Sequence, residues 1–506
     1  MIAAVVEEKP KPNVHGEHSA VQEIQWDDFR DHLSTAEKDG RRRWLYPRRP
    51  AGFWHDHRTR LSWLLIAVMF AGPWIHIGGN PLLLVNIVER RFSILGQIFW
   101  PQDTVIFAVA MLVFFAGIMI FTTAFGRLWC GWTCPQTVMM EMVFRKLEYL
   151  IEGDAAEQRA LDAEAWTGRK IFKKALKHIV FFSASFIVGN TLLAYIIGSD
   201  QLLHIQLDDP RNHVVGLTFM ILFSLLFYAI FARFREQACT FICPYGRFQS
   251  ALLDENTLLV AYDNKRGETR APLHRDETFD QRRAEGKGDC VNCHACVAVC
   301  PTGIDIRNGV QMECVNCTAC IDACDAIMDK VGRPRGLIRF ASLNNITHGT
   351  RQRFTPRMAL YSGVLTALIS LFIYLVFTRC DVETTLLRAP GSLFQVTPGG
   401  RIENLYTMKI VNKTMHDIPV ELRLENLSGT VRVMGGGGFT VPAAKLAQTS
   451  VLIELDPGQL HHTNTKLKIG IYTAKGRLLE TVATAFAGPR ESDHHEESEK
   501  HENERR

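Results

Sequence analysis

The chain has 506 residues, with 57 Lys and Arg against 53 Asp and Glu, and a formal net charge of +4. So small a charge on so long a chain does not favour a nucleic-acid partner, and we expect none. Hydrophobic residues make up 47% of the chain and gather in five blocks, which excludes an ordinary soluble protein. The first 50 residues are polar and lack the apolar core of a signal peptide, so no cleavable leader is expected.

The five apolar blocks carry no charged residues, and each is near the ~20 residues that a helix needs to cross about 30 Å of hydrocarbon. They are Leu61–Gly79, Thr104–Phe125, Ile179–Gly198, Val214–Ala232 and Met358–Thr378. A single block of this kind could be a buried helix of a soluble protein. Five of them in one chain predict a five-helix transmembrane bundle.

The distribution of Lys and Arg predicts the orientation of these spans. Arginines crowd the segment before the first block, and the segments after the second and fourth blocks are also basic, whereas the loop after the third block has only Arg211. The positive-inside rule therefore places the N-terminus in the cytoplasm, and an odd number of spans places the C-terminus in the periplasm. Twelve of the thirteen cysteines then lie on the cytoplasmic side. Cys380 lies outside alone, and we assign it no role.

These patterns divide the chain into six regions of a multi-domain membrane protein. They are a cytoplasmic N-terminal region (1–60), four membrane helices with two paired-cysteine motifs (61–257), a cytoplasmic linker and ferredoxin-type domain (258–357, core 286–330), a fifth membrane helix (358–378), a periplasmic domain (379–488) and a disordered tail (489–506). In the periplasmic domain, short alternating segments between turns, including the glycine run 435–438, predict an all-β immunoglobulin-like sandwich. The tail is charged and poor in apolar residues, so its His494, His495 and His501 are expected in solvent.

Eight cysteines lie close together in the ferredoxin-type region, in the pattern C-x2-C-x2-C-x3-C repeated twice. The first run holds Cys290, Cys293, Cys296 and Cys300, and the second holds Cys314, Cys317, Cys320 and Cys324. This is the pattern of bacterial two-cluster ferredoxins, in which the last cysteine of each run binds the cluster of the other run. It predicts one [4Fe–4S] cluster on Cys290, Cys293, Cys296 and Cys324, and a second on Cys314, Cys317, Cys320 and Cys300.

Two such clusters make one-electron transfer the expected chemistry of this domain. Zinc is the alternative, but it prefers four ligands in separated pairs rather than eight at this spacing. Pro301 follows the first run, whereas Asp325 follows the second, a departure that removes no ligand and concerns the surroundings of one cluster. No glycine-rich dinucleotide loop follows a predicted strand, so the electrons are expected to come from a partner.

Two further cysteine pairs, Cys130–Cys134 and Cys239–Cys243, have the pattern C-x3-C-P and follow the second and fourth predicted spans. Both spans run inward in the predicted topology, so the four thiols are expected at the cytoplasmic membrane face. The proline after each pair favours the first turn of a new helix. Cys134 and Cys243 are then at helix N-termini, where the dipole favours the thiolate. The four cysteines could bind zinc, bind copper(I) or accept electrons, and their spacing does not choose among these roles.

Three histidines lie near the outer face in this topology: His76, His204 and His213. A haem needs axial ligands on facing helices, and nothing in the sequence pairs these residues in that way. The sequence therefore does not favour a haem.

In chain order, the sequence has four apolar blocks with two C-x3-C-P pairs, a two-cluster ferredoxin-type region, a fifth apolar block and a predicted immunoglobulin-like domain. With this order of features, it resembles the CcoG family of cytochrome c oxidase accessory proteins of bacterial cytoplasmic membranes, also called FixG or RdxA. The resemblance covers about residues 40 to 490 and includes all twelve cytoplasmic cysteines. It implies an oxidoreductase that reduces copper(II) to copper(I) for the copper centre of cbb3-type oxidase and acts as an assembly factor. It also implies that Cys130, Cys134, Cys239 and Cys243 handle the metal, with copper as substrate or transient ligand.

The resemblance further implies partners, namely the oxidase assembly machinery and copper-delivery proteins, besides an unidentified electron donor and membrane lipid. Two other functions are compatible with the same residues. More distant membrane ferredoxins of the NosR and NapH type share the paired motifs, so a quinol-linked carrier that passes electrons to a respiratory partner is one alternative. A non-catalytic assembly scaffold with structural clusters is the other.

Overall fold

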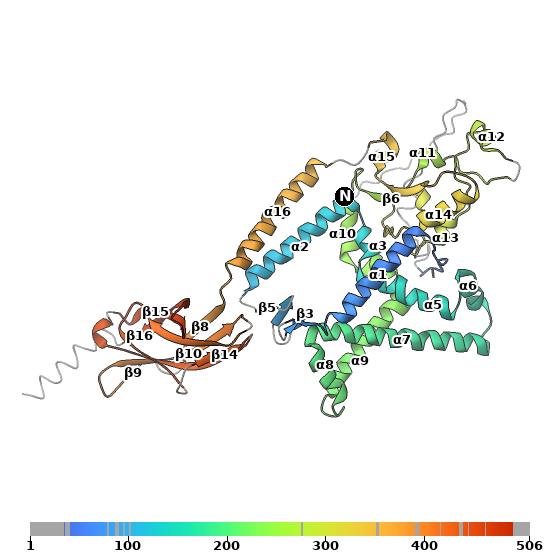
Figure 1. Cartoon of the computed structure of the whole chain (residues 1–506). Helices are drawn as coiled ribbons and strands as arrows, with labels where there is room; N and C mark the ends of the chain where they lie inside the picture. Colours follow the sequence, from blue (N-terminus) through green and yellow to red (C-terminus); the bar gives the residue numbers. More distant parts are fainter. Residues whose placement is uncertain are drawn as a thin grey trace, which may run out of the picture. The chain divides into compact units, whose positions relative to one another are not determined.

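The computed structural model of the chain (Figure 1) describes residues 35, 41–77, 80–86, 91–94, 97–100, 103–274, 277–350, 354–389, 394–414, 416–434, 439–443, 445–460 and 462–488. The predicted disordered tail with its three histidines, the glycine run and most of the N-terminal region lie outside the described residues. The chain divides into two compact units. Unit 1 takes its described residues from Met1–Trp63, Thr122–Val180 and Ala232–Arg353, and unit 2 from Leu64–Phe121, Phe181–Phe231 and Phe354–Arg506.

Four helices among the described residues are long and apolar enough to cross a membrane. They are α2 (Thr104–Phe125), α7 (Gly168–Ile197), α9 (Val214–Ala229) with the π-helical turn η3 (Ile230–Phe234) that continues it, and α16 (Pro356–Phe377). These helices coincide with the last four predicted spans, although α7 begins at Gly168 rather than at Ile179. Its first turns are basic, because the helix extends beyond the apolar block on that side.

The first predicted span differs from the structure. Helix α1 is Phe53–Ala71, after which the chain turns and enters the short strand β1 (His76–Ile77). Pro73 follows Gly72, and a proline disfavours helical backbone at the residue before it, so the helix ends at this dipeptide. The first half of α1 carries Asp56, Arg58 and Arg60, so α1 lacks the apolar composition of the other four helices although it has 19 residues. The predicted count of five spans is therefore not confirmed.

Unit 1 surrounds the two cysteine runs with short helices and one two-stranded sheet. Its shorter elements are α3 (Leu128–Trp132), α4 (Pro135–Val138), η2 (Met139–Phe144), α5 (Arg145–Ile151), α6 (Ala155–Ala163), η4 (Ala238–Ile242), α10 (Pro244–Leu252), β6 (Leu259–Tyr262), α11 (Asn264–Gly267), α12 (Phe279–Ala284), α13 (Ala295–Ala298), η5 (Ile306–Asn308), α14 (Ala319–Lys330), β7 (Ile338–Ala341) and α15 (Leu343–His348). Strands β6 and β7 pair antiparallel, with Leu259 opposite Ala341. Both cysteine runs lie between these strands in sequence, and several cysteines pack into the same buried cluster as Val260, Met328 and Ile338.

The helical stretch after the first C-x3-C-P pair is also part of unit 1. Helix α4, the π-helix η2 and α5 follow one another without a break. Met139, Met142 and Phe144 are buried in the protein. This face of the segment therefore packs within unit 1 and does not contact lipid.

Unit 2 contains small strands near the membrane helices and a β-rich C-terminal domain. Its remaining elements are β2 (Asn80–Pro81), β3 (Leu83–Asn86), β4 (Arg91–Ile94), β5 (Gln97–Phe99), α8 (Ser199–Leu207), β8 (Val382–Arg388), β9 (Gln395–Val396), β10 (Ile402–Asn412), β11 (Ile418–Leu424), β12 (Gly429–Val433), β13 (Phe439–Val441), β14 (Leu446–Leu455), η6 (Pro457–Gln459), β15 (Asn464–Thr473) and β16 (Leu478–Ala487). The strands of the C-terminal domain are the alternating segments that the sequence predicts.

These C-terminal strands form two antiparallel sheets, ordered β12-β14-β10-β8, with β9 added to β10, and β13-β11-β15-β16 (Figure 1). Along β10, buried side chains alternate with partly exposed ones, as expected for a strand with one face on a core. Tyr406 of β10 lies opposite Val451 of β14, and its hydroxyl donates a hydrogen bond of 2.8 Å to the carbonyl of Ala485 in the other sheet. The sandwich has no disulfide, and its core is made of fully buried apolar residues such as Ile453 and Phe486.

A buried ion cluster lies within unit 2 next to the start of α2. Asp103 forms ion pairs of 2.7 Å with Arg379, which follows α16, and of 2.6 Å with Lys413, which follows β10. Lys413 also pairs with Glu383 at 2.8 Å. These residues and Cys380 line a cavity of about 240 Å³. None of the other twelve cysteines lines this cavity.

Candidate metal centres

The two cysteine runs form loops of the same shape. Asn292 and Asn316 precede the second cysteine of their runs, and His294 and Thr318 follow it, all four with left-handed backbone at φ values of 53°, 53°, 55° and 67°. Such conformations cost about 1–3 kcal/mol each in residues other than glycine. The curl that they produce turns successive N–H groups and side chains to one side, an arrangement that favours bound anions such as cluster sulfur. Both loops adopt this unfavourable backbone conformation at the same two positions, which indicates that the two loops have the same function.

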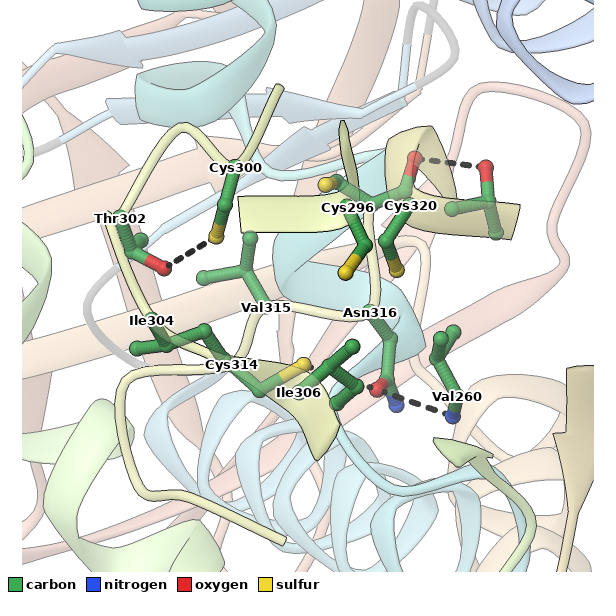
Figure 2. Close-up of a pocket in the computed structure, with 12 residues that line it drawn as sticks. Val260, Cys296, Cys300, Thr302, Ile304, Ile306, Cys314, Val315, Asn316 and Cys320 are labelled. Carbon is green, nitrogen blue, oxygen red and sulfur yellow. Dashed lines mark hydrogen bonds between the residues drawn. The ribbon is translucent and has the colours of Figure 1, made fainter. Parts of the chain in front are cut away.

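Each loop borders a cavity lined by cysteines of both runs. The first cavity is lined by Cys296, Cys300, Cys314, Cys317 and Cys320, together with apolar side chains such as Ile304 and Ile306 (Figure 2). The second cavity is lined by Cys290, Cys293, Cys296 and Cys324. The last cysteine of each run thus lies in the cavity of the other run, and Cys296 borders both cavities. Figure 2 shows the sulfur atoms of Cys300, Cys314 and Cys320 turned into the space that they enclose.

The donor set and its surroundings fit iron–sulfur ligation. Burial raises the pKa of Cys296, Cys314 and Cys324 to about 12 and that of Cys317 to about 11. Without metal these groups are neutral thiols at physiological pH, and binding of metal cations replaces their protons. Four cysteines line one apolar cavity and five line the other, with Cys296 common to both, so each cavity has at least the four sulfur donors that a cubane cluster needs.

The two loops are held by different neighbours. Arg307 donates one hydrogen bond of 2.7 Å to Oδ1 of Asn292 and pairs with Asp305 at 2.6 Å, so an arginine braces the first loop. In the second loop, the Oδ1 atom of Asn316 instead accepts a hydrogen bond of 3.3 Å from the backbone of Val260. Strand β6, which contains Val260, therefore holds the second loop through Asn316.

Asp325, which stands where the first run has Pro301, has a local structural effect. Helix α14 continues through Asp325, whereas α13 ends before Pro301. The Oδ1 atom of Asp325 accepts a hydrogen bond of 2.8 Å from the backbone N–H of Gly336, and its charge contributes to the raised pKa of Cys324. The presence of aspartate rather than proline after the second run thus changes the surroundings of one cavity, whose four cysteines remain in place.

The second cysteine of each C-x3-C-P pair lies at a helix N-terminus, as predicted. Cys134 is the N-cap of α4 and Cys243 is the N-cap of α10, each followed by its proline in the first turn. The first cysteine of each pair lies in the preceding short helix, Cys130 in α3 and Cys239 in η4. Proline suits the first helical position because its fixed φ is helical and its missing N–H is not needed there.

The two pairs converge within unit 1. Burial raises the pKa of Cys130 to about 11, and the neighbouring thiols of Cys134 and Cys243 add to the effect. Burial likewise raises the pKa of Cys239 to about 12, with contributions from Cys134, Cys130 and Cys243. All four thiols are therefore close enough to interact electrostatically. Cys130 is in addition held by a hydrogen bond of 3.2 Å from its Sγ to Oε1 of Gln249.

The first pair packs directly against the second cysteine loop. Gly131 has no side chain, and a Cβ atom at its position would lie 2.2 Å from the carbonyl oxygen of Val315. The indole Nε1 of Trp132 donates a hydrogen bond of 3.3 Å to the carbonyl of Asn316. On the other side, Arg58 donates a hydrogen bond of 2.7 Å to the carbonyl of Gly131. The backbone between Cys130 and Cys134 is thus in contact with the backbone between Cys314 and Cys317.

The second pair reaches the same region. Cys239 lines a small cavity together with Thr302 and Val315, two residues that also line the cavity of Cys314, Cys317 and Cys320. None of the four paired cysteines lines either cluster cavity among the described residues. Both pairs nevertheless adjoin residues that line the cavity of Cys300, Cys314, Cys317 and Cys320, the first through Gly131 and the second through the small cavity of Cys239.

A buried ion network fixes the chain that leads into Cys239. Arg235 has a left-handed backbone with φ of 52°, and its guanidinium pairs with Glu148 at 2.6 Å. Lys177 pairs with the same carboxylate at 2.6 Å. Burial opposes ionisation of Glu148, but Arg235 and Lys177 outweigh it and lower its pKa to about 2. The backbone N–H of Cys239 then bonds to the carbonyl of Glu236, the residue next to Arg235.

Replacement of Glu148 with glutamine should destabilise unit 1, because it leaves Arg235 and Lys177 buried with one counter-charge fewer. The expected loss is about 3 kcal/mol, typical of a broken buried ion pair, and it would be measured as a lower thermal midpoint of the detergent-solubilised protein. Because the pKa of Glu148 is depressed, its contribution is present above the unfolded pKa and is lost as the pH falls towards about 2. Asp329→Asn is the matched control, since its pair with Arg335 is exposed, and it should leave the midpoint unchanged. An equal effect of both variants would contradict this prediction.

Three protein-family models match parts of this architecture. A family model described as a 4Fe-4S dicluster domain matches residues 234–343, one described as a 4Fe-4S binding domain matches residues 107–152, and one for the IG-like fold at the C-terminus of FixG matches residues 372–489. A crystal structure of a FixG-related protein from Vibrio parahaemolyticus matches 21% of this chain and 95% of its own, at a TM-score of 0.19 and 22% identity.

Three relatives match most of the chain. It is 34% identical to protein RdxA of Cereibacter sphaeroides over 88% of this chain and 97% of that protein. It is 32% identical to nitrogen fixation protein FixG of Rhizobium meliloti over 87% of this chain and 88% of that protein. Identity to protein RdxB of Cereibacter sphaeroides is 31% over 83% and 95% of the two chains.

Ferredoxin-type cysteine loops, four apolar helices and a C-terminal immunoglobulin-like domain define a membrane-associated iron–sulfur redox protein. The identity to RdxA and FixG over nearly the full length of both chains then places it in a family. The chain belongs to the FixG/RdxA family.

Proposed function

We propose that this protein reduces copper(II) to copper(I) at the four cysteines of the C-x3-C-P pairs, for assembly of the copper centre of cbb3-type cytochrome c oxidase. The observation that carries the proposal is the convergence of Cys130, Cys134, Cys239 and Cys243 beside the second cysteine loop. Thiolates are soft ligands and favour copper(I) over copper(II), so binding at this site draws the reduction forward. Each copper(II) ion takes up one electron and becomes copper(I), while a partner protein replaces that electron.

The eight cysteines of the two runs would hold two [4Fe–4S] clusters. The cavity linings support a crossed arrangement, with one cluster on Cys290, Cys293, Cys296 and Cys324, and the other on Cys314, Cys317, Cys320 and Cys300. When bound, such clusters supply electrons one at a time. The apolar residues around both cavities exclude water from the sulfur ligands, and Arg307 and Asn316 keep the two loops in shape.

The paired cysteines themselves bind, orient and release the copper ion. Burial keeps Cys130 and Cys239 protonated until a metal arrives, so copper binding must release protons and should weaken as the pH falls. Gln249 orients the Cys130 thiol through its hydrogen bond. The partners of such a site would be the oxidase assembly machinery and copper-delivery proteins, with an unidentified protein as electron donor.

The test is replacement of Cys130, Cys134, Cys239 and Cys243 with serine. The variant should keep its iron–sulfur absorbance, because the eight other cysteines are intact, and it should lose copper(II) reduction and copper(I) binding. Reduction would be measured anaerobically, on dithionite-reduced and desalted protein, from the reoxidation of the clusters by added copper(II). A variant that reduces copper as fast as its parent would overturn the proposal and leave the paired cysteines a structural role.

A third iron–sulfur cluster on the same four cysteines is the second candidate. The specific observation in its favour is the match of a 4Fe-4S binding family model to residues 107–152, a segment whose only cysteines are Cys130 and Cys134. Iron content distinguishes the two candidates. Two clusters give about eight irons per chain in parent and four-serine variant alike, whereas a third cluster gives about twelve that fall to about eight in the variant.

We place the ferredoxin-type domain in the cytoplasm and the immunoglobulin-like domain in the periplasm of a bacterial inner membrane. Basic residues flank the segments assigned to the cytoplasm. The N-terminal segment contacts the ferredoxin-type domain, so both would lie on the same side of the membrane. The chain would then cross the membrane an even number of times between them. The backbone N–H of Arg48 bonds to the carbonyl of Ala298 at 2.7 Å, and that of Trp54 bonds to Asp322 at 3.1 Å. With α2, α7 and α9 as three crossings, the segment from α1 to β5, which precedes α2, would supply the fourth.

Reporter fusions test this sidedness. A reporter that works only in the periplasm should be active when fused after residue 488, and a reporter that works only in the cytoplasm should be active when inserted at Gly286. Gly286 is suitable because a side chain there would meet open space. The reverse pattern of activity would invalidate the placement of both domains.

A further inference from the structure

The turn between α8 and α9 brings together two histidines that the sequence does not pair. His204 lies in the last turn of α8, and His213 is the N-cap of α9. Their rings meet edge to face, with centroids 5.8 Å apart. His76 is in β1, where its Nδ1 lies 3.0 Å from the carbonyl oxygen of Trp74.

Asp208 completes a group of three potential metal ligands. One ligand atom from each of His204, Asp208 and His213 lies within 4.8 Å of the other two. The Nε2 atom of His213 is 2.9 Å from Oδ2 of Asp208. Ligand atoms bound about 2.0–2.2 Å from one metal ion stand about 3–4 Å apart, so small rotations of these partly exposed side chains would bring all three to a common ion. Solvent water can reach the remaining coordination positions.

The backbone around this group is held in place. Oδ1 of Asp208 accepts a hydrogen bond of 2.8 Å from the N–H of Asp209, and the N–H of Leu217 bonds to the carbonyl of His213 at 2.9 Å. Beneath the turn, Leu202 of α8 and Met220 of α9 belong to one buried apolar cluster. The two histidines are therefore presented by packed helices, which lowers the entropy lost when a metal binds.

We propose that His204, Asp208 and His213 form a binding site for a divalent transition-metal ion of the copper(II) and zinc class. Two imidazoles and one carboxylate are borderline ligands that suit copper(II) and zinc(II) rather than magnesium or calcium. The Irving–Williams order makes copper(II) the tightest of the divalent ions at such a site. Nearby Asp200 and Asp209 outnumber Arg211, so the local charge favours a cation.

This site differs from the paired cysteines in its chemistry and in its place in the sequence. Its nitrogen and oxygen donors favour the oxidised copper ion, whereas thiols favour the reduced one. The site precedes α9 and the Cys239–Cys243 pair follows η3, so one candidate span separates them in sequence. If that helix crosses the membrane, the site faces the opposite side. The inference does not depend on the copper reduction proposed above.

The experiment uses the full-length protein with the four paired cysteines replaced by serine and with His494, His495 and His501 replaced by alanine. These changes remove the thiol site and the tail histidines as competing copper ligands. The protein is kept oxidised, so that [4Fe–4S] clusters give no electron paramagnetic resonance signal, and it is titrated with copper(II). One copper(II) ion per chain should bind with a spectrum split by imidazole nitrogen, and a large molar excess of zinc(II) should reduce this signal, since copper(II) binds more tightly than zinc(II).

His204→Ala and His213→Ala should each weaken copper(II) binding more than about tenfold, while His76→Ala serves as the matched control and should change nothing. Iron content and the thermal midpoint show whether each variant is folded. If an alanine variant is not folded, His204→Gln is tested in its place. Nitrogen splitting and affinity that persist in both histidine variants would overturn the proposal. Equal losses in the His76 control would do the same.

Discussion

The double variant Cys300→Ala, Cys314→Ala should keep one iron–sulfur cluster and contain about four irons per chain instead of about eight. The reason is the crossed lining of the cavities, because Cys300 of the first run shares its cavity with Cys314 of the second. Both replacements then fall on the same cluster. Anaerobic iron and acid-labile sulfide assays, with the visible absorbance as a second measure, provide the result.

The matched double variant is Cys296→Ala, Cys300→Ala, in which both replacements fall in the first run. With crossed ligation they remove one ligand from each cluster, so both clusters should be lost or strongly depleted. With sequential ligation, in which each run binds its own cluster, the two double variants would exchange their outcomes. Four irons in the Cys296→Ala, Cys300→Ala protein and none in the other would therefore refute the crossed arrangement.

Features that rest on local sequence were predictable. The last four apolar blocks coincide with helices because length and absence of charge suffice to define a span. The prolines after Cys134 and Cys243 predicted helix starts, because proline geometry suits the first helical turn wherever it occurs. The strands of the immunoglobulin-like domain followed from their alternating pattern in the same way.

The first span shows where a hydropathy pattern is insufficient. The block Leu61–Gly79 is uncharged throughout, yet α1 ends at Ala71. The dipeptide Gly72–Pro73 was the sequence signal for this helix end, because proline restricts the backbone of the residue before it. An average of hydropathy over the block does not detect this effect. The contacts of Arg48 and Trp54 with the ferredoxin-type domain were not predictable, because they join residues about 250 positions apart and depend on tertiary packing.

The candidate site was predictable in its cysteines and not in the residues around them. A regular repeat predicts ligands because metal geometry fixes their spacing. Asn292 and Asn316 hold the same position in both runs, and a repeated asparagine beside a tight loop is a signal for left-handed backbone that sequence analysis missed. Trp132 and Arg58 gave no such signal, since their roles depend on contact with a loop far away in the sequence.

Gly131→Ala should slow copper(II) reduction by about a hundredfold while leaving iron content and copper(I) binding nearly unchanged. A Cβ atom at this position would come 2.2 Å from the carbonyl oxygen of Val315 and 3.1 Å from that of Asn316. Backbone atoms cannot yield as a flexible side chain does, so the paired cysteines and the second cysteine loop must move apart. A displacement of about 1 Å in a reacting geometry can cost about a hundredfold in rate, and the overpacking itself should cost about 1–3 kcal/mol.

Gly168→Ala is the matched control in the same unit, because a Cβ atom there would meet nothing within 4 Å. It should reduce copper(II) at the rate of the parent. Stopped-flow reoxidation of the reduced protein measures the rate, and iron content shows that both variants retain their clusters. The Trp132→Phe variant removes the hydrogen bond to Asn316 without overpacking and should give a smaller decrease in the same direction. If Gly131→Ala retains the parent rate, the contact between Gly131 and Val315 is not on the route by which electrons reach the paired cysteines.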